Sequence, residues 1–577
     1  MIFYDFEVFK CDWLVVLIDM TNKEETVIVN DRKKLESFYS KNKSGIWVGF
    51  NSRHYDQYIL KGILAGFNPK EINDYIIVRG LPGWQFSNVF REFPLINYDV
   101  MSGIDRGLKT FEGFMGNNIK ESSVPFDIDR KLTPAELAET IKYCRHDVEQ
   151  TVRVFMERIA DFETQMGLIE MFNMPLSNIS KTKVQISAEI LEAKRPITPY
   201  NDEFDISFPP TLNIKKYSAV VDWYKNPGNM CYEYVTGKGT MKKNQLEIMV
   251  AGVPHQFGWG GVHGAVEKYS GEGYFINMDV ASLYPSLMIR YNLHSRSCNP
   301  EKFNDIVNTR LKFKAEKNPL QAPLKIVING TYGAMKDKNN PLYDPRQANN
   351  VCVYGQLLLL DLIEHLEPYC EIIQSNTDGV LIRMPDGQNE DKFFNLVDDI
   401  AFEWEQRTGL KLEFDEYRKV YQKDVNNYII VDAEGKYKSK GAYVKKLSTL
   451  DYDLPIVNKA VVEYIVQGIP VEVNISKCDR LKEFQQVKKI SGKYKYILHG
   501  DKILKEKCIR VFASKSLSDG GLSKVHNLTG RAAKLENTPS HAFLWNDSVE
   551  DVKCPSKLDK QWYIELANKR LEDFGVM

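Results

Sequence analysis

The sequence has no long apolar run, no internal repeat, no low-complexity linker and almost no net charge over its 577 residues. No hydrophobic stretch reaches the roughly 20 residues that a membrane-spanning helix needs, so we expect no membrane partner. The first residues form an acidic, strand-like segment unlike a signal peptide, which favours a cytoplasmic location. The net charge of −1 gives no overall attraction to nucleic acid, so any such binding must come from local patches.

Cysteine is also sparse and follows no pattern. The nine cysteines are an odd number and include no C-x-x-C pair. This distribution is typical of reduced thiols, and it argues against a disulfide framework and against a cysteine-based zinc site.

The chain is too long for one hydrophobic core, and its patterns predict an α/β multidomain protein. Residues 1–155 alternate short strands with helical stretches. Further along we expect a strand at 274–280, helices at 286–293, 301–335 and 354–367, and a strand–turn–strand unit at 371–384. After about residue 450 we expect mixed helix and loop. The lysine- and tyrosine-rich stretch 483–509 is more typical of a solvated face than of a nucleic-acid groove.

The opening stretch, MIFYDFEVF, places two carboxylates in an apolar segment. Its aromatic and β-branched residues predict a strand, in which Asp5 and Glu7 point to the same face. Two half-buried carboxylates repel each other unless a cation lies between them, so a divalent metal site is one interpretation. An edge strand with a solvated face is the simpler interpretation for an isolated D-x-E pair.

Two later segments add acidic residues and favour the metal site. Asp56 follows an apolar strand in VGFNSRHYDQYIL, close to Asn51. The residues TPAE at 133–136 predict a helix start, and on that helix Tyr143 and Asp147 are four residues apart and share a face. Four carboxylates and a tyrosine suit two divalent ions that activate water for cleavage of a phosphate ester, with the tyrosine orienting the water.

A second acidic pair lies in the middle of the chain. Asp279 ends a strand in GYFINMDVASLYPSLMIRYN, and Asp378 lies in a tight turn between two strands. Carboxylates on adjacent strands are able to hold two Mg²⁺ ions, one at a 3′-hydroxyl and one at a nucleoside triphosphate. Between them, Lys325, Asn329 and Tyr332 share one helix face that offers a cation, an amide and an aromatic ring.

These motifs resemble those of two enzyme families. The order D-x-E, N-x-x-x-Y-D, Y-x-x-x-D is similar to the three motifs of the DEDDy 3′–5′ exonucleases, which have the ribonuclease H-like fold. The stretches D-x-x-S-L-Y-P, K-x-x-x-N-x-x-Y-G and N-T-D resemble motifs A, B and C of family B DNA polymerases, most of all the compact phage and plasmid enzymes.

The resemblance covers roughly residues 1–445 and implies a domain order. An exonuclease domain is expected at 1–160, and a polymerase palm at 161–450 with short fingers at about 290–345. A thumb and C-terminal region would follow at 451–577. The implied partners are primer–template DNA, deoxynucleoside triphosphates and accessory replication proteins, in the bacterial host cytoplasm if a phage encodes the chain.

The resemblance also assigns roles to single residues. The exonuclease would use, as catalytic residues, Asp5, Glu7, Asp56, Tyr143 and Asp147, the four carboxylates being metal ligands. The polymerase would hold its metals with Asp279, Asp378 and the Val280 carbonyl. Two Mg²⁺ ions are implied in each site, with Mn²⁺ as a substitute.

Further roles concern the nucleotide and the DNA. Tyr284 would be the steric gate against a ribose 2′-hydroxyl, and Lys325 would contact the triphosphate. Other nucleotide contacts are expected from Asn329, Tyr332, Arg310 and Lys314. DNA contacts are expected from Asn51, from Gly260 and Gly261 of FGWGG, and from Lys440 and Tyr443.

The sequence departs from the family patterns at several positions. Asn376 stands where motif C usually has its first aspartate. LKTF (108–111) resembles the exonuclease segment that holds the single strand, but Gly107 stands where a hydroxyl residue is usual. FGWGG lacks the tyrosine of the Y-x-G-G segment that it resembles. In the exonuclease, Lys120 is a candidate for neutralising charge. Two alternatives therefore stay open: an exonuclease with an impaired polymerase site, and a non-catalytic replication scaffold that binds nucleic acid.

The spacing of the polymerase motifs bears on priming. Protein-primed relatives carry extra segments between motifs A and B and between B and C. Here Lys325 lies 46 positions after Asp279, and Asp378 lies 53 positions after Lys325. These intervals leave little room for insertions, so we expect extension of an ordinary nucleic-acid 3′-hydroxyl, with weak intrinsic processivity unless a partner helps.

Overall fold

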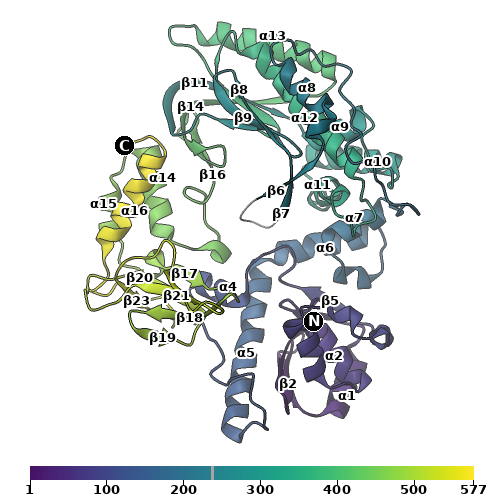
Figure 1. The fold of residues 1–577 in the computed structure, drawn as a ribbon, viewed down its shortest axis with the longest axis vertical. Helices are drawn as coiled ribbons and strands as arrows, with labels where there is room; N and C mark the ends of the chain where they lie inside the picture. Colours follow the sequence, from purple (N-terminus) through teal and green to yellow (C-terminus); the bar gives the residue numbers. More distant parts are fainter. Residues whose placement is uncertain (236–239) are drawn as a thin grey trace. The chain divides into compact units, whose positions relative to one another are not determined.

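A computed structural model describes residues 1–235 and 240–577, and the chain folds into two compact units (Figure 1). Unit 1 contains residues 1–182, 447–457 and 475–564, and unit 2 contains residues 183–446, 458–474 and 565–577. Each unit therefore combines segments that are far apart in the sequence. The three predicted domains, 1–160, 161–450 and 451–577, are not the same divisions as these two units. Their assignment as exonuclease, palm with fingers, and thumb stays a prediction.

Unit 1 is built on a five-stranded mixed sheet, which confirms the α/β pattern of the N-terminal region. The strand order is β3-β2-β1-β4-β5. Strands β1, β2 and β3 are antiparallel, whereas β4 runs parallel to both β1 and β5. The strands are β1 (Ile2–Val8), β2 (Trp13–Asp19), β3 (Glu24–Val29), β4 (Ile46–Gly49) and β5 (Ile96–Asp99).

Alternation along β1 divides its side chains between two hydrophobic clusters. Phe3 packs in a cluster with Val148 and Phe155, whereas Tyr4 and Phe6 pack on the opposite side. Asp5 and Glu7 come two and four residues after Phe3, so their side chains point to the same face of the strand and face the helix that carries Val148. The helices of the N-terminal part are α1 (Arg32–Asn42), α2 (Asp56–Ala65), α3 (Pro69–Asn73), α4 (Leu108–Met115), α5 (Pro134–Glu157) and α6 (Ile159–Met171).

The start of α5 confirms the predicted capping signal. The Thr133 hydroxyl accepts a hydrogen bond from the Glu136 amide at 3.3 Å, and the Glu136 carboxylate accepts one from the Thr133 amide at 2.8 Å. This reciprocal pair satisfies amides that a helix start otherwise leaves without partners.

Residues 486–544 consist largely of strands, so the expectation of mixed helix and loop after about residue 450 is wrong for this segment, whereas 455–467, 471–477 and 560–573 are helical. Lysine and tyrosine alternate at the start of the segment YKYILH, in which Ile497 is buried. One sheet has three strands, β17 (Gln486–Lys489), β20 (Cys508–Ala513) and β23 (Ala542–Leu544). The other has four, β18 (Tyr494–His499), β19 (Lys502–Leu504), β21 (Leu522–His526) and β22 (Ala532–Lys534).

A fully buried arginine joins β20 to the end of α4. Arg510 donates hydrogen bonds to the carbonyls of Gly113 (3.1 Å) and Asn117 (2.7 Å) on one side. On the other side it donates to the carbonyls of Trp545 (3.1 Å) and Asp547 (2.6 Å). Burial lowers the pKa of Arg510 to about 10, so it stays charged at neutral pH.

Unit 2 contains a nine-stranded sheet in the order β16-β15-β14-β11-β13-β12-β10-β9-β8. The long strands β11 and β14 lie side by side in it (Figure 1). The predicted strand–turn–strand unit at 371–384 is confirmed as β12 and β13. The strands are β8 (Leu246–Val250), β9 (Val253–Phe257), β10 (His263–Ala265), β11 (Tyr269–Val280), β12 (Glu371–Asn376), β13 (Gly379–Arg383), β14 (Leu412–Asp424), β15 (Asn427–Val431) and β16 (Tyr437–Lys440). A separate hairpin pairs β6 (Tyr232–Val235) with β7 (Thr240–Lys243).

The predicted helices at 286–293 and 354–367 are present with earlier starts, at residues 283 and 345. The stretch 301–335 forms two helices, because Lys317 adopts a positive φ and Pro319 follows it. The helices in this part of the chain are α7 (Lys183–Ile190), α8 (Ser218–Lys225), α9 (Leu283–Arg290), α10 (Pro300–Ala315), α11 (Gln321–Met335), α12 (Pro345–Leu366) and α13 (Glu390–Thr408). Three more follow later in the chain, α14 (Pro455–Gln467), α15 (Val471–Lys477) and α16 (Lys560–Asp573).

Two further expectations bear on the whole chain. All nine cysteines are free thiols. Across residues 1–235 and 240–577, no helix combines the length and the hydrophobicity needed to cross a bilayer.

The intervals between the polymerase motifs are occupied by α9 to α12 and β12.

Arg510→Met should lower the free energy of unfolding of unit 1 by about 3 kcal/mol, because four carbonyl groups lose a charged hydrogen-bond donor and a buried side chain loses its polar contacts. The midpoint of urea unfolding, followed by hydrogen exchange of β20, measures this loss. The exposed Arg531→Met is the matched control. Equal midpoints for the two variants would show that Arg510 does not hold these segments together.

Candidate active sites

Four carboxylates of unit 1 meet on the α5 side of the sheet. Asp5 and Glu7 lie on β1, Asp56 is the first residue of α2, and Asp147 lies on α5. The Asp56 carboxylate accepts a hydrogen bond from the Phe6 amide at 3.1 Å, which anchors the start of α2 to β1 between the two acidic residues. The structure therefore brings together all the acidic residues that the three N-terminal motifs predicted.

Burial and mutual repulsion disfavour the charged forms of these groups. The pKa values of Asp5 and Glu7 are raised, chiefly by burial and further by the neighbouring carboxylates. Burial raises the pKa of Asp56 to about 7 and that of Asp147 to about 6. An all-oxygen donor set of this kind fits hard divalent cations such as Mg²⁺ or Mn²⁺, which would restore the charged forms.

A lysine that sequence reasoning missed lies against the third motif. The Lys109 ammonium forms ion pairs with Asp147 and, at 3.0 Å, with Glu112, and it lies 4.6 Å from the centroid of the Tyr143 ring. Burial and Asp147 raise the pKa of Tyr143, which keeps its hydroxyl protonated. The backbone amide of Lys120, the predicted cation, donates a hydrogen bond to the Glu112 carboxylate at 3.2 Å. Nothing in the sequence besides the GLKTF pattern pointed to Lys109.

The loop that carries Asn51 is held by a second missed residue. The buried Asp99 carboxylate accepts hydrogen bonds from the amides of Asn51 (2.9 Å) and Arg53 (3.0 Å). Asn51 itself adopts a positive φ of 60°, which asparagine tolerates. Asp99 thus fixes the turn that leads into Asp56. A DNA contact by Asn51 stays a prediction.

In unit 2, the two predicted polymerase carboxylates are placed next to each other by strand pairing. Asp279 on β11 lies opposite Gly379 on β13, and the Val280 amide donates to the Asp378 carbonyl at 2.7 Å. A side chain at position 379 would collide with the Asp279 carboxylate, so this register needs a glycine. The pKa of Asp279 is raised by burial and by Asp378, and burial also raises the pKa of Asp378.

Asn376, the departure in motif C, is the last residue of β12. Its side-chain amide donates a 3.5 Å hydrogen bond to the Val425 carbonyl in the β14–β15 turn. It also lies opposite His263 in the pairing of β10 with β12. An amide at this position makes contacts that need no negative charge, and Asp378 is the carboxylate of this turn.

Two aromatic rings meet beside these carboxylates. Tyr284 on α9 and Tyr332 on α11 stack with centroids 4.2 Å apart. The Lys336 ammonium lies 4.4 Å from the Tyr332 centroid, and the Tyr332 hydroxyl hydrogen-bonds with the Cys352 thiol at 2.6 Å. Burial raises the pKa values of both tyrosines. The structure therefore brings the predicted gate residue against the predicted aromatic residue of motif B.

The other predicted nucleotide contacts lie on α10 and α11. Lys325 and Asn329 are exposed, on the same face of α11 as Tyr332. On α10, the Arg310 Nε is buried without a hydrogen-bond partner, and Lys314 is exposed, with its ammonium 4.0 Å from the Glu413 carboxylate. Nucleotide binding by any of them stays a prediction.

The glycine-rich segment packs on the turn that carries Asp378. The Thr377 amide donates to the Val262 carbonyl at 2.8 Å, and a side chain at Gly261 would collide with Thr377. The Gly260 carbonyl accepts a hydrogen bond from Gln356 at 2.7 Å. Sequence reasoning missed Gln356, because its role depends on a contact almost 100 residues away.

The remaining predicted DNA contacts lie on the opposite flank of the sheet. Lys440 at the end of β16 lowers the pKa of Asp378, against the larger effect of burial. Tyr443 lies between two cations, 4.8 Å from the Lys423 ammonium and 4.7 Å from the Arg570 guanidinium. These positions surround the predicted site, and DNA binding by them stays a prediction.

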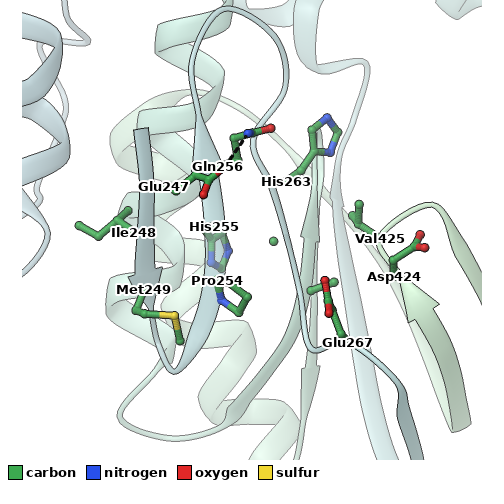
Figure 2. Close-up of a pocket in the computed structure, with 12 residues that line it drawn as sticks. Glu247, Ile248, Met249, Pro254, His255, Gln256, His263, Glu267, Asp424 and Val425 are labelled. Carbon is green, nitrogen blue, oxygen red and sulfur yellow. Dashed lines mark hydrogen bonds between the residues drawn. The ribbon is translucent and has the colours of Figure 1, made fainter. Parts of the chain in front are cut away.

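Figure 2 shows a cavity of about 540 Å³ beside this site, between β8–β10 and the β14–β15 turn. Three carboxylates line it, from Glu247, Glu267 and Asp424. Negative charge of this kind repels phosphate groups. The lining of this cavity therefore disfavours the binding of phosphate groups.

Comparisons with known proteins point to one class. No protein-family model matches the chain. Parts of it are similar to curated archaeal DNA polymerases. "DNA polymerase 1" of Sulfurisphaera ohwakuensis is 26% identical over 225 residues, which are 38% of this chain and 23% of that protein. "DNA polymerase 1" of Saccharolobus solfataricus is 24% identical over 333 residues, which are 49% of this chain and 34% of that protein.

The chain thus spans about a third or less of the length of these curated relatives. Among solved structures, the family B DNA polymerase from the hyperthermophilic archaeon Pyrobaculum calidifontis aligns with 99% of this chain and 77% of that chain. The TM-score is 0.38, and the sequences are 15% identical.

The raised carboxylate pKa values predict a pH-dependent stability of unit 1 without divalent metal. Between about pH 4 and 7 the folded protein binds more protons than the unfolded chain, so its free energy of unfolding should fall as the pH rises. With EDTA, the melting temperature should be lower at pH 8 than at pH 6. Added Mg²⁺ should raise it more at pH 8, where it competes with fewer protons.

Asp56→Asn is the control for this measurement, because it removes one titrating carboxylate and one metal ligand. The variant should show a weaker pH dependence in EDTA and a smaller Mg²⁺ effect. If Mg²⁺ stabilises the native sequence equally at both pH values, the four carboxylates do not form one metal site.

Proposed function

We propose that the chain is a family B DNA polymerase with a 3′–5′ proofreading exonuclease, of the compact type found in phages and plasmids. The observation that carries the proposal is the presence of two separate carboxylate sites, one in each unit, built from the two sets of motifs in the order of that family. Similarity to curated archaeal DNA polymerases supports it.

In the proposed polymerase site, Asp279 and Asp378 hold two Mg²⁺ ions together with the Val280 carbonyl. When bound, these ions supply the positive charge that activates the primer 3′-hydroxyl and stabilises the leaving pyrophosphate. Lys325 at the start of α11 binds the triphosphate. Tyr284, braced by its stack on Tyr332, occupies the space that a ribose 2′-hydroxyl needs.

In the proposed exonuclease site, the four carboxylates of unit 1 hold the metals and Tyr143 orients the attacking water. Lys109 holds Asp147 and Tyr143 in place from the far side. The sheet of β1 to β5, with its antiparallel and parallel strands, supports a ribonuclease H-like fold for residues 1–160.

Asn376 favours one alternative, an exonuclease whose polymerase site is impaired. A primer-extension assay with Mg²⁺, with and without deoxynucleoside triphosphates, separates the proposals. Extension supports the polymerase, and shortening alone supports the impaired enzyme. The absence of both extension and shortening supports a binding scaffold.

We also propose that the substrate is an ordinary 3′-hydroxyl, because the intervals between the motifs hold only α9 to α12 and β12.

Asp378→Asn should reduce nucleotide addition by at least 1000-fold and leave shortening of single-stranded DNA intact, because it removes a ligand from one site only. Asp5→Ala combined with Glu7→Ala should do the reverse and raise the error rate. Gel analysis of a labelled primer with a mismatched 3′ end measures both. Loss of shortening in a folded Asp378→Asn protein would contradict two independent sites.

Tyr284→Ala should admit ribonucleotides, because the space that the ring fills becomes free. The ratio of kcat/KM values for dATP and ATP should fall by about 100-fold, and Tyr284→Phe, which keeps the ring, should discriminate like the native sequence. Unchanged discrimination in Tyr284→Ala would exclude the gate role.

A further inference from the structure

A buried thiol lies against the carboxylates of β1. Cys144 is on α5, three residues before Asp147, and its side chain is fully buried. The thiol donates a hydrogen bond to the Asp5 main-chain carbonyl at 3.3 Å, and its sulfur also lies 3.6 Å from the Asp5 carboxylate oxygen Oδ2. The nuclease proposed for unit 1 gives this thiol no role.

Three donor groups of two kinds meet at this place. One carboxylate oxygen of Asp5, one of Glu7 and the Cys144 sulfur all lie within 4.8 Å of one another. We call these three side chains the thiol site. They form a mixed oxygen and sulfur donor set, in contrast to the all-oxygen set of the four carboxylates. Hard cations such as Mg²⁺ prefer oxygen ligands, whereas thiolate ligands favour softer ions such as Zn²⁺.

Glu7 is the member of the thiol site without a partner. It is only 7% exposed, and within residues 1–235 and 240–577 its carboxylate forms neither a hydrogen bond nor an ion pair. Lys109, the neighbouring cation, is paired with Asp147 and Glu112 instead. A buried carboxylate without a partner costs free energy unless a cation compensates for it. Glu7 therefore points to a bound metal ion independently of the thiol.

The separation between sulfur and oxygen fits ligands of one zinc ion. Zinc binds thiolate sulfur at about 2.3 Å and carboxylate oxygen at about 2.1 Å, so two such ligands at a tetrahedral angle stand about 3.6 Å apart. The Cys144 sulfur and the Asp5 Oδ2 atom already have this separation. A modest movement of the Glu7 side chain would bring in the third ligand, and water would supply the fourth.

We propose that Cys144, Asp5 and Glu7 form an inhibitory site for Zn²⁺ and similar thiophilic ions. Binding replaces the S–H bond by a metal–sulfur bond and releases one proton to solvent. It also occupies two carboxylates that the proposed nuclease needs for its own metals, so degradation should stop. The inhibitory role rests on the proposed exonuclease, whereas the binding of the ion is testable without it.

Cd²⁺ is the probe of binding, because a cadmium–thiolate bond has an ultraviolet charge-transfer band that carboxylate binding lacks. Titration of the full chain with Cd²⁺ in the presence of Mg²⁺ should produce this band, and Cys144→Ser should lose one thiolate's share of it. The matched control is Cys508→Ser, which changes another buried thiol of unit 1 and should keep the full band in this comparison if Cys508 binds no ion. Cys144→Ala removes the sulfur without adding a hydroxyl and should match Cys144→Ser.

Zn²⁺ is the probe of inhibition. The rate at which each variant shortens a labelled single-stranded oligonucleotide is compared with its own rate in Mg²⁺ alone. Both Cys144 variants should need at least about tenfold more Zn²⁺ for half-inhibition, because a direct ligand is lost. Primer extension is the internal control: Asp279 and Asp378 belong to no such thiol-containing donor group among the described residues, so its Zn²⁺ sensitivity should not change.

The outcomes separate the inference from the function on which it rests. If the native chain shortens no DNA in Mg²⁺, the proposed exonuclease is wrong, and the cadmium band still decides whether the thiol site binds metal. If both Cys144 variants keep the full band, Cys144 is not a ligand and the inference is wrong. If they lose part of the band but keep the native Zn²⁺ sensitivity, the inhibitory role is wrong, and the neighbouring group of Glu112, His146 and Asp147 becomes the place of inhibition.

Discussion

The confinement of carboxylates in partly desolvated groups is the constraint on which both candidate sites depend. Six acidic side chains are held in two groups, where burial raises their pKa values and, for all of them except Asp378, a neighbouring carboxylate raises the pKa further. Such groups cost free energy in the folded protein unless a cation compensates for them. The surrounding elements must therefore be stable enough on their own to keep the carboxylates together, and the hydrophobic clusters on both sides of β1 show how unit 1 meets this demand.

The two sites solve this problem with different backbone devices. Unit 1 gathers carboxylates from a strand and two helix positions, and it fixes them by contacts such as that between the Phe6 amide and Asp56. Unit 2 relies on strand pairing, which places Asp279 opposite Gly379, where a side chain would collide with the Asp279 carboxylate. The first arrangement depends on many separate contacts, whereas the second depends on one hairpin and its neighbouring strand.

Features that are local in sequence could be predicted, and features that depend on distant contacts could not. The strand of Asp5 and Glu7, the Thr133 cap and the hairpin of Asp378 follow from patterns within about ten residues. Asp99 and Gln356 gave no signal, and Lys109 gave none beyond the GLKTF pattern, because an isolated lysine, aspartate or glutamine has many structural uses. The strands after residue 480 were missed because their exposed lysines concealed a period of two, and the break at Pro319 was overlooked within a helical stretch.

The composition of unit 1 has a consequence for the order in which the chain folds on the ribosome. Residues 1–182 leave the ribosome long before residues 475–564, which complete the same unit. Until then, the carbonyls of Gly113 and Asn117 lack the donor that Arg510 later supplies, and the apolar surface around Phe114 lacks Val487. The N-terminal sheet must therefore persist as an incomplete intermediate through the synthesis of nearly 300 intervening residues. Slow translation of that middle segment would prolong the exposure of this surface and favour aggregation or capture by chaperones.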